Sequence, residues 1–482
     1  MKCVKKTNFL PSFPTTLFGS PKRSLQEQIL RERQKLATSA LSDLALLFGS
    51  LLPAVFLQDI SFNKRRRVYT EVVVFWAWLG QVLLFNASCS KAVTMIRSWC
   101  STQKLPAPSA GNGAYCSARK RLRLEFLQTI FKHIVKTLNR RIRPEDRWRG
   151  LVLKSIDGSS VQLMDTKENQ KDFSQPSAQK KGCGFPVMGM AGVLNHAHGG
   201  WEGFVTADFT EHDHRVAHQL IKYFDKGDLA LADTAYSSYE LIARLSLKGV
   251  FSLMPLHQTR KADFRKGKKI GKNERVYTWP KPKIQPKRSN LTEDDWSKIP
   301  VTMEVRIIRF WYTDKDGKQK RKHLVTTLLD SKKYGWEELV SLYMERWDIE
   351  LRFRDIKTTM GFEELNVKTP EMARKSLAMA MIGFNLVKAV SQEAADFKNE
   401  SIRCISFKGA LDEISSHGAN FRNRGKHRLK CVELYQNLVS LVGDHILDIR
   451  PLRREPRAVK KRPKSFPKLT ITRSDWKARR AA

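Results

Sequence analysis

Three acidic residues, Asp157, Asp233 and Glu350, stand where their carboxylates could act together. Asp157 follows a short apolar run and precedes a glycine, and Asp233 ends a second apolar run. Such runs are typical of buried strands, and carboxylates at strand ends in a mixed sheet face the crevice where ligands bind. With Glu350 they could hold two hard divalent cations through oxygen ligands. Two such ions activate the attacking oxygen and stabilise the leaving oxygen in phosphoryl transfer.

Glu350 lies in a stretch without Gly or Pro, from Tyr343 to Lys357, which predicts a helix. At about 100° per residue, one side of this helix collects one carboxylate, a phenol and several cations. The members of that side are Tyr343, Arg346, Glu350, Arg354 and Lys357. An adjoining apolar stripe would pack on a core. One acid among fixed cations suits a site that holds a metal and several phosphates.

Each of these features also has a simpler interpretation. An Asp-Gly pair after a strand is often a turn, and a single Asp after a buried strand can cap the next helix. The helix of Glu350 could be a solvated one with Glu–Arg and Glu–Lys pairs at helical spacing. The joint occurrence of three acids in this order, in a very basic chain, favours the functional interpretation.

The charge balance of the chain is unusual. Among 482 residues, 87 Lys and Arg outnumber 48 Asp and Glu, which gives a net charge of +39 and a pI near 10.1. Because such an excess repels itself in the folded state, a polyanionic partner is expected, nucleic acid first and an anionic membrane surface second. The most apolar run, Val72–Phe85, falls short of the ~20 residues needed to cross a bilayer and predicts a buried helix. The 7 scattered cysteines indicate reduced thiols in a cytosolic protein.

Helical patterns occupy the N-terminal part of the chain, across about 22–59, 70–86 and 88–100. A long amphipathic helix is expected over Tyr115–Leu138, with Arg119 and Arg121 among the basic residues of its first turns. Short helices followed by a helix with a basic start resemble a helix-turn-helix-like DNA-binding unit. A solvated face would show the same pattern, and that alternative stays open.

Strand patterns begin near residue 150. Their order is three strands, helix, strand, helix, strand, which predicts a mixed α/β domain of RNase H-like type. Further strands after a basic stretch predict a β-rich insertion between the second acid and the third. The predicted division is a helical N-terminal DNA-binding domain over 1–148, the catalytic core over 149–370 with the insertion at 257–325, a helical C-terminal region over 371–450 and a basic tail over 451–482.

The spacing Tyr343-(2)-Arg346-(3)-Glu350-(6)-Lys357 resembles the signature of one branch of bacterial insertion-sequence transposases of the DDE class. The sequence Ile156-Asp157-Gly158-Ser159 and the Asp233 that ends Leu231-Ala232-Asp233 fit the same family. The resemblance extends over about 65–470. One departure is Thr234 after Asp233, where the family often has Arg or another polar residue; this concerns a neighbouring contact and leaves the acid in place.

The resemblance implies a DNA transposase of the bacterial cytosol, associated with the nucleoid and not with a membrane. Such an enzyme binds the inverted-repeat ends of double-stranded DNA, and it cleaves and joins strands with two Mg²⁺ ions, for which Mn²⁺ would substitute. Joining two ends requires at least a homodimer on DNA. The three acids would bind the metal, and phosphates would be held by Tyr343, Arg346 and Lys357, to which helix position adds Arg354.

Two tryptophans are candidates for stacking a flipped base, as relatives in this branch do. They are Trp311 in the insertion and Trp347 beside Arg346. An aromatic residue in a strand or an amphipathic helix is often part of a core, so this alternative also stays open. Two other functions would suit the chain: a catalytically inactive, domesticated DNA-binding protein, and a metal-dependent nuclease without strand transfer.

His214 and His218 are four residues apart, beside His212, but no Glu-rich zinc signature accompanies them, so a metal role is not favoured. His196 and His198 flank a predicted turn and are expected to be exposed.

Overall fold

The computed structural model describes residues 44–447, apart from 46, 62–68, 103–105, 178–179, 181, 211–212, 287–290, 314–316 and 425–427, together with 471–472, 475–476 and 478–479. The predicted N-terminal helix start at about 22, the basic run Lys64–Arg67 and most of the predicted tail over 451–482 lie outside these residues.

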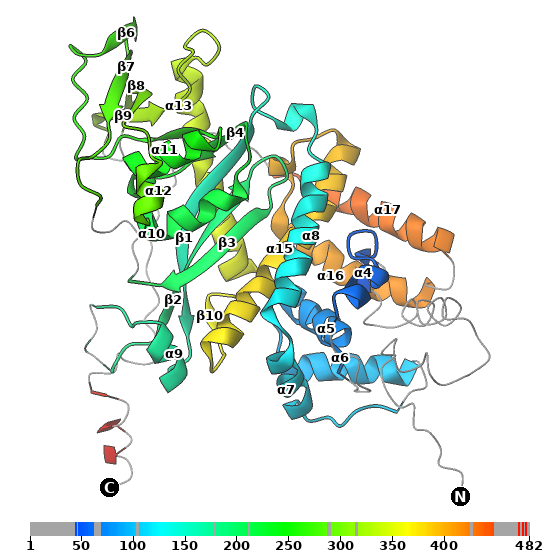
Figure 1. Ribbon diagram of the computed structural model, residues 1–482. Coiled ribbons are helices and arrows are strands. Elements are labelled where there is room, and N and C mark those ends of the chain that lie inside the picture. Colours follow the sequence, from blue (N-terminus) through cyan, green and yellow to red (C-terminus); the bar gives the residue numbers. More distant parts are fainter. Residues whose placement is uncertain are drawn as a thin grey trace, which may run out of the picture. The chain divides into compact units, whose positions relative to one another are not determined.

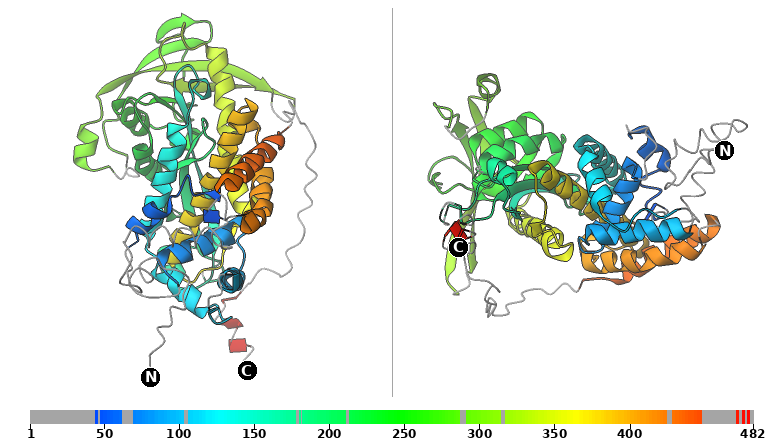
Figure 2. Two further views of the ribbon diagram at one scale, coloured as in Figure 1. Left: turned by 90° about the vertical axis from the view of Figure 1, so that its right-hand side faces the viewer. Right: turned by 90° about the horizontal axis from the view of Figure 1, so that it is seen from below.

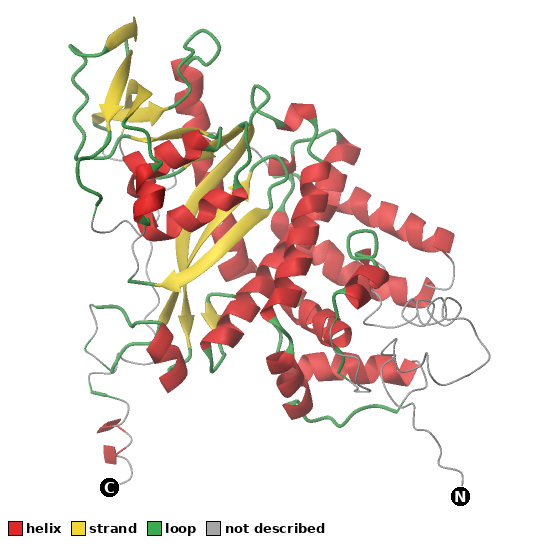
Figure 3. Ribbon diagram, viewed as in Figure 1, coloured by secondary structure: helices red, strands yellow, loops and turns green. Residues whose placement is uncertain are grey.

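The chain divides into two compact units, each assembled from separate segments (Figure 1). Unit 1 comprises residues 1–141, 355–363 and 371–450, and unit 2 comprises residues 142–354, 364–370 and 451–482. All of the described strands belong to unit 2, whereas the described part of unit 1 is built from helices (Figure 3). The four segments predicted as functional domains remain a prediction.

Unit 1 is organised around the helix α5 (Glu71–Leu83), which is buried along its whole length. The long helix α15 (Pro370–Lys398) approaches α5 closely, because a Cβ at Gly383 would lie 2.8 Å from Val82 Cγ1. Phe384 of α15 stacks on Phe407 with ring centroids 4.5 Å apart. The other helical segments of unit 1 are α4 (Ala54–Asp59), α6 (Cys89–Thr102), α7 (Gly113–Arg121), α8 (Leu124–Arg140), η5 (Asp355–Thr359), η6 (Ile402–Cys404), α16 (Phe407–Arg424) and α17 (Arg428–Asp444).

The apolar run at 72–85 is therefore a buried helix up to Leu83, as predicted, whereas Leu84 and Phe85 at its end lie outside the helix and are exposed. A search of the described residues finds no helix with the length and apolar character that a membrane span requires. The single helix expected over 115–138 was wrong in one respect, because α7 and α8 are separate. Between them Leu122 has an extended backbone, with ψ 125°, and only 1% of this residue is exposed. The interruption of the helix therefore places the leucine side chain in the core.

Unit 2 contains a ten-stranded sheet with the order β3-β2-β1-β4-β5-β9-β8-β7-β6, and β10 (Glu364–Leu365) pairs with the end of β1. The first three strands, β1 (Val152–Leu163), β2 (Val187–Asn195) and β3 (Trp201–Asp208), are antiparallel neighbours. β4 (Asp228–Leu231) pairs with β1 in parallel, and β5 (Phe251–Pro255) pairs with β4 in parallel. Helices α10 (Asp213–Leu220) and α11 (Tyr239–Leu247) fall between the strands as expected, which confirms the RNase H-like core.

The predicted insertion extends this sheet and does not form a separate one. Its strands are β6 (Lys268–Gly271), β7 (Glu274–Pro280), β8 (Thr302–Thr313) and β9 (Gln319–Thr326), with α12 (Glu293–Ser297) between β7 and β8. β9 pairs with β5, and Leu253 stands opposite Thr326. Figure 2 shows these light green strands from two further directions. The insertion is therefore joined to the core sheet through β5. This strand is the neighbour of β4, and Asp233 follows β4 in the sequence.

Alternating side chains of the central strands pack into two cores. Ile156 belongs to the core formed with α10 and α11, whereas Leu153 belongs to the core formed with α13 (Trp336–Met344). Because neighbours along a strand alternate, the odd-numbered residues of β1 face the helix α13 and the segment that follows it. Asp157 is one of these residues.

Candidate active site

Asp157 lies inside β1 and not at its end, so this part of the prediction was wrong, as was the alternative of a turn. The strand continues to Leu163 because residues 158–162 keep pairing with β2, where Gly158 stands opposite Ala191. On its other side β1 loses a neighbour at this point, since the pairing with β4 ends at Ser155–Leu231. Asp157 is therefore exposed to the gap that opens in the sheet where β4 stops.

Asp233 lies level with Asp157. Both residues come two positions after the last pair, Ser155 and Leu231, of two parallel strands. Asp233 caps the short helix η3 (Thr234–Tyr236), and its Oδ1 accepts a hydrogen bond of 2.8 Å from Ala235 N. The capping role that the sequence left open is thus real, and it occupies one carboxylate oxygen.

The segment around Glu350 is helical throughout, but it is not one regular α-helix. It comprises α13, the 3₁₀ turn η4 (Glu345–Trp347), α14 (Asp348–Arg354) and the π-helical turn η5 (Asp355–Thr359). Sequence spacing could not show these changes of winding, which are frequent at functional sites. Ile349 and Phe353 of α14 are buried and form the expected apolar stripe.

Arg346 connects two of the three acids. Its Nη1 lies 3.2 Å from Asp157 Oδ2, and its Nη2 lies 3.2 Å from Glu350 Oε1. Only 7% of Arg346 is exposed, and the Asp157 side chain is 17% exposed, whereas the Glu350 side chain is 41% exposed and remains open to solvent. The two acids, predicted from segments nearly two hundred residues apart in the sequence, thus bind one guanidinium.

The electrostatics of Asp157 differ from those of a surface carboxyl. Its pKa is raised to about 6, chiefly by burial and also by the negative charges of Asp233 and Glu350, against the opposing effects of Gly158 N–H and Arg346. Burial also raises the pKa of the Tyr343 phenol, against the opposing charge and hydrogen bond of Arg346. A carboxylate crowded by two others is stabilised by added positive charge, which is the condition for binding a cation.

The carboxylates form a hard oxygen donor set of the kind that Mg²⁺ and Mn²⁺ prefer. Within the part of the chain that the structure describes, however, no three His, Cys, Asp or Glu side chains stand close enough to hold an ion as they are. Arg346 occupies the position between Asp157 and Glu350. The residues fit a divalent ion by their chemistry, provided that the guanidinium moves aside.

The other predicted side chains around Glu350 differ in exposure. Trp347 is 54% exposed, and the Arg346 guanidinium lies 5.3 Å from its ring centroid. Arg354 is exposed at the end of α14. Lys357 lies in η5, which belongs to unit 1.

Trp311 lies on β8 and is 48% exposed. It stands opposite Arg321 of β9, and the Arg309 guanidinium lies 5.2 Å from its ring. Because about half of it is exposed, this indole is not part of a core.

The two N-terminal arginines occupy different environments within unit 1. The Arg119 guanidinium lies 3.9 Å from the Trp78 ring centroid, and its Nη1 lies 3.0 Å from Cys89 Sγ. Arg121 is exposed at the end of α7. Of the two, Arg121 is thus the more accessible to a polyanion.

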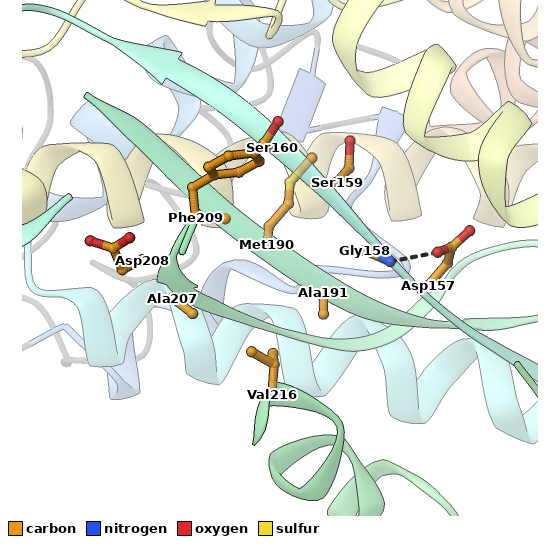
Figure 4. A pocket seen from close by; sticks show the side chains of 11 residues that line it. Asp157, Gly158, Ser159, Ser160, Met190, Ala191, Ala207, Asp208, Phe209 and Val216 are labelled. Carbon is orange, nitrogen blue, oxygen red and sulfur yellow. Dashed lines mark hydrogen bonds between the residues drawn. The ribbon is translucent and has the colours of Figure 1, made fainter. Parts of the chain in front are cut away.

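A hollow of about 270 Å³ adjoins Asp157 along β1. Small residues line much of it, and Figure 4 shows Val216 opposite Ala191, with the hydrogen bond from Gly158 N to Asp157 Oδ1 (2.8 Å) at one end. Phe209, an exposed aromatic residue, stands at the other end. Asp157 therefore lies at the edge of an open hollow whose lining also includes Ser159 and Met190.

Beside these acids lies a buried polar network that the sequence pattern did not predict. His196 and His198, expected to be exposed, are 6% and 0% exposed. His196 Nε2 lies 2.7 Å from Ser155 Oγ, and His198 Nε2 lies 3.5 Å from Glu202 Oε1. The turn between β2 and β3 is folded against the sheet, which a polar Asn-His-Ala-His-Gly-Gly sequence does not reveal.

Lys154 is the sequence feature that could have predicted this buried network, because it is a lone cation in an apolar strand. It is 2% exposed, and its Nζ lies 2.8 Å from Asp228 Oδ2 and 3.4 Å from Glu202 Oε1. A buried ammonium group requires such partners.

Residues 148–386 match the family model described as "Transposase DDE domain". The chain belongs to the DDE transposases, and it is a DNA transposase of an insertion sequence. Transposases of this family use divalent metal ions, in keeping with the three carboxylates. The substrate of such an enzyme is DNA, which agrees with the charge of +39.

Among curated proteins, the chain is similar to "Transposase InsG for insertion sequence element IS4" of Escherichia coli K12. The two are 24% identical over 407 residues, which cover 84% of this chain and 88% of that protein. It is also 24% identical to "Putative transposase InsZ" of the same organism, over 28% of this chain and 46% of that protein. Among solved structures, a piggyBac transposase synaptic complex with hairpin DNA is 10% identical, with a TM-score of 0.41 over 84% of this chain and 85% of that one.

Proposed function

We propose that Asp157, Asp233 and Glu350 are the metal ligands of this transposase and hold two Mg²⁺ ions, for which Mn²⁺ would substitute. The observation that supports this most directly is the position of Arg346, 3.2 Å from both Asp157 and Glu350. A buried cation shared by two acids supports the proposal that positive charge is bound at this position. When bound, the ions would activate water and then a freed 3′-hydroxyl as nucleophiles on DNA phosphates.

The residues of the chain then have distinct tasks. Arg346 would leave the acids when metal enters and donate charge-assisted hydrogen bonds to a phosphate oxygen of the transposon end. Tyr343, Arg354 and Lys357 would hold neighbouring phosphates. This set completes the Tyr-Arg-Glu-Lys signature and would place the chain in the branch that the signature defines.

Base stacking is assigned to Trp311 and Trp347, which are both about half exposed. A half-exposed indole next to an arginine offers a stacking surface with a cation at its side, which single-stranded or flipped bases favour. Arg119 and Arg121 would contact DNA with the N-terminal helices. Concerted joining of two ends would require a homodimer on DNA, acting in the bacterial cytosol by a cut-and-paste route.

A cleavage and joining assay tests the proposal. The substrate is labelled duplex DNA with the ends of the element that encodes the chain, incubated with Mg²⁺ or with EDTA. Wild type should give metal-dependent nicks at the end's terminus and joined strands, and Asp157→Ala should give neither. Nicks without joined strands would indicate a nuclease, and binding without any cut would indicate a DNA-binding protein without catalysis.

A further inference from the structure

The hairpin of β2 and β3 contacts the helix α14 at two places within unit 2. The first is a ring contact between Trp201 and Phe353, whose centroids are 4.7 Å apart. Trp201 is the first residue of β3 and is fully buried. Phe353 follows Glu350 by three residues and therefore lies on a neighbouring part of the same helix surface.

The second contact is made by His196, which lies directly after β2. Its Nε2 is 2.7 Å from Ser155 Oγ, and its Nδ1 is 3.8 Å from Asp348 Oδ2. Ser155 precedes Asp157 by two residues and shares its face of β1. Asp348 precedes Glu350 by two residues on α14. The imidazole thus lies between the strand of one acid and the helix of another.

The Trp201 ring is also fixed from the side of the sheet. Gly192 stands opposite Asp157 in the pairing of β1 with β2. A Cβ at Gly192 would lie 2.6 Å from Trp201 Cζ3, closer than side-chain atoms approach one another. The indole therefore rests against the bare backbone beside Asp157 and cannot move further toward the sheet. Its thickness sets how far Phe353 stands from this part of the sheet.

We propose that His196 and Trp201 are positioning residues that set Glu350 relative to Asp157. This inference rests on the proposed function, because it treats the two acids as ligands of the same metal site. Mg²⁺ accepts oxygen ligands only at about 2.0–2.1 Å, so a small displacement of α14 weakens binding. Partners behind the ligands typically affect metal affinity by about 10- to 100-fold.

Mn²⁺ affinity measures this effect without relying on catalysis. Free Mn²⁺ is followed by electron paramagnetic resonance while the full chain is titrated, alone and bound to end DNA. His196→Leu should weaken Mn²⁺ binding about 10-fold. His196→Gln, which retains a polar group near the Nε2 position, should stay within about threefold of wild type. In the DNA complex, the Mn²⁺ concentration for half-maximal cleavage should rise in parallel.

A matched control comes from His218, a second buried histidine of unit 2 that lies 3.2 Å from Arg244 and on the opposite face of the sheet from α13. His218→Leu should lower the melting temperature and leave Mn²⁺ affinity unchanged. Should His196→Leu fail to fold, Gly192→Ala tests the same idea through Trp201, because it displaces the indole and removes no polar group. It should weaken Mn²⁺ binding to a similar extent.

Ser155→Ala tests whether His196 acts through its contact with Ser155. If His196 acts through Ser155, the double variant Ser155→Ala/His196→Leu should bind Mn²⁺ no more weakly than His196→Leu alone. Wild-type affinity in both His196→Leu and Gly192→Ala would overturn the inference, provided that Asp157→Asn has lost Mn²⁺ binding. Wild-type affinity in Asp157→Asn would instead overturn the proposed function, and the positioning role with it.

Discussion

Lys154 and Asp157 are three residues apart on β1 and face opposite sides of the sheet. Their surroundings differ in whether neighbouring groups balance the charge of the side chain. Lys154 has carboxylate partners and the carbonyl of Tyr223 at 3.0 Å, so its charge is neutralised by groups already present. Asp157 has two acids and one shared guanidinium around it. In the cluster around Lys154, opposite charges pair and stabilise the fold. In the cluster around Asp157, negative charge is in excess and can bind a cationic ligand.

The pKa values express the same difference. Burial opposes ionisation of Glu202, but hydrogen bonds and charge from His198, Lys154 and Asn195 hold its pKa at about 2. Burial raises the pKa of Asp157 to about 6, because its partners do not compensate for lost water and for the nearby acids. One strand therefore carries a satisfied cluster on one face and an unsatisfied cluster on the other.

Removing the acid from the unsatisfied cluster should produce the largest effect. Asp157→Asn should reduce DNA cleavage by about 10⁴-fold or more, since it removes a ligand that both metal ions need. The melting temperature at pH 7 should not fall. An assay of end cleavage combined with thermal unfolding checks both statements, and a marked loss of stability would contradict the comparison.

Disrupting the satisfied cluster around Lys154 should instead lower the stability of the protein. Lys154→Met leaves Glu202 and Asp228 without their buried counter-charge and should cost about 3–5 kcal/mol of unfolding free energy. Chemical denaturation measures this loss. The double variant Lys154→Met/Glu202→Gln should recover part of it, because one of the two unpaired charges is then removed. Equal stability of all three proteins would show that the cluster is not a source of stability.

The two clusters should also respond to pH in opposite directions. Glu202 has a depressed pKa, so its contribution of roughly 3 kcal/mol is present above pH 4.5 and is lost as the pH falls toward 2. Asp157 has a raised pKa, so the folded state is favoured below about pH 4 and loses roughly 2–3 kcal/mol as the pH rises through 6. Unfolding free energies of wild type, Glu202→Gln and Asp157→Asn between pH 3 and 8 would separate these windows.

Arg346 allows a finer test of the unsatisfied cluster. Because its guanidinium occupies the place of a cation, Arg346→Gln should bind Mn²⁺ about 10-fold more tightly in the absence of DNA, a change of about 1.4 kcal/mol. The same variant should cleave DNA more slowly, because a phosphate contact is lost. Arg354→Gln is a suitable control for Mn²⁺ binding in the absence of DNA, since that side chain is exposed at the end of α14. Weaker Mn²⁺ binding by Arg346→Gln would mean that the arginine supports the metal site and does not compete with it.

Much of the fold followed from the sequence, because periodic patterns identify strands and helices wherever one face is buried. The order of elements around β1, β4 and β5 and the buried helix α5 were of this kind. The three acids could be named because each follows or lies beside such a pattern. Their roles as metal ligands remain a prediction.

The parts that were missed depend on contacts between distant segments. The continuation of β1 past Asp157 depends on pairing with β2, and the burial of His196 depends on a turn folding back toward Ser155. The winding changes at η4 and η5 leave no mark on residue spacing. No local pattern encodes these features, since they arise only when the sheet has formed.

The division of unit 1 into separate segments has a consequence for the order in which the protein can mature on the ribosome. Val82 of α5 packs against Gly383 of α15, and some 300 residues, including nearly all of unit 2, are made between them. At about 5–20 residues per second, the apolar surface of α5 must wait roughly 15–60 s for this partner. The catalytic sheet therefore emerges complete before the helical unit that was begun first, and a pause or truncation before residue 383 would leave α5 uncovered while the sheet is already folded.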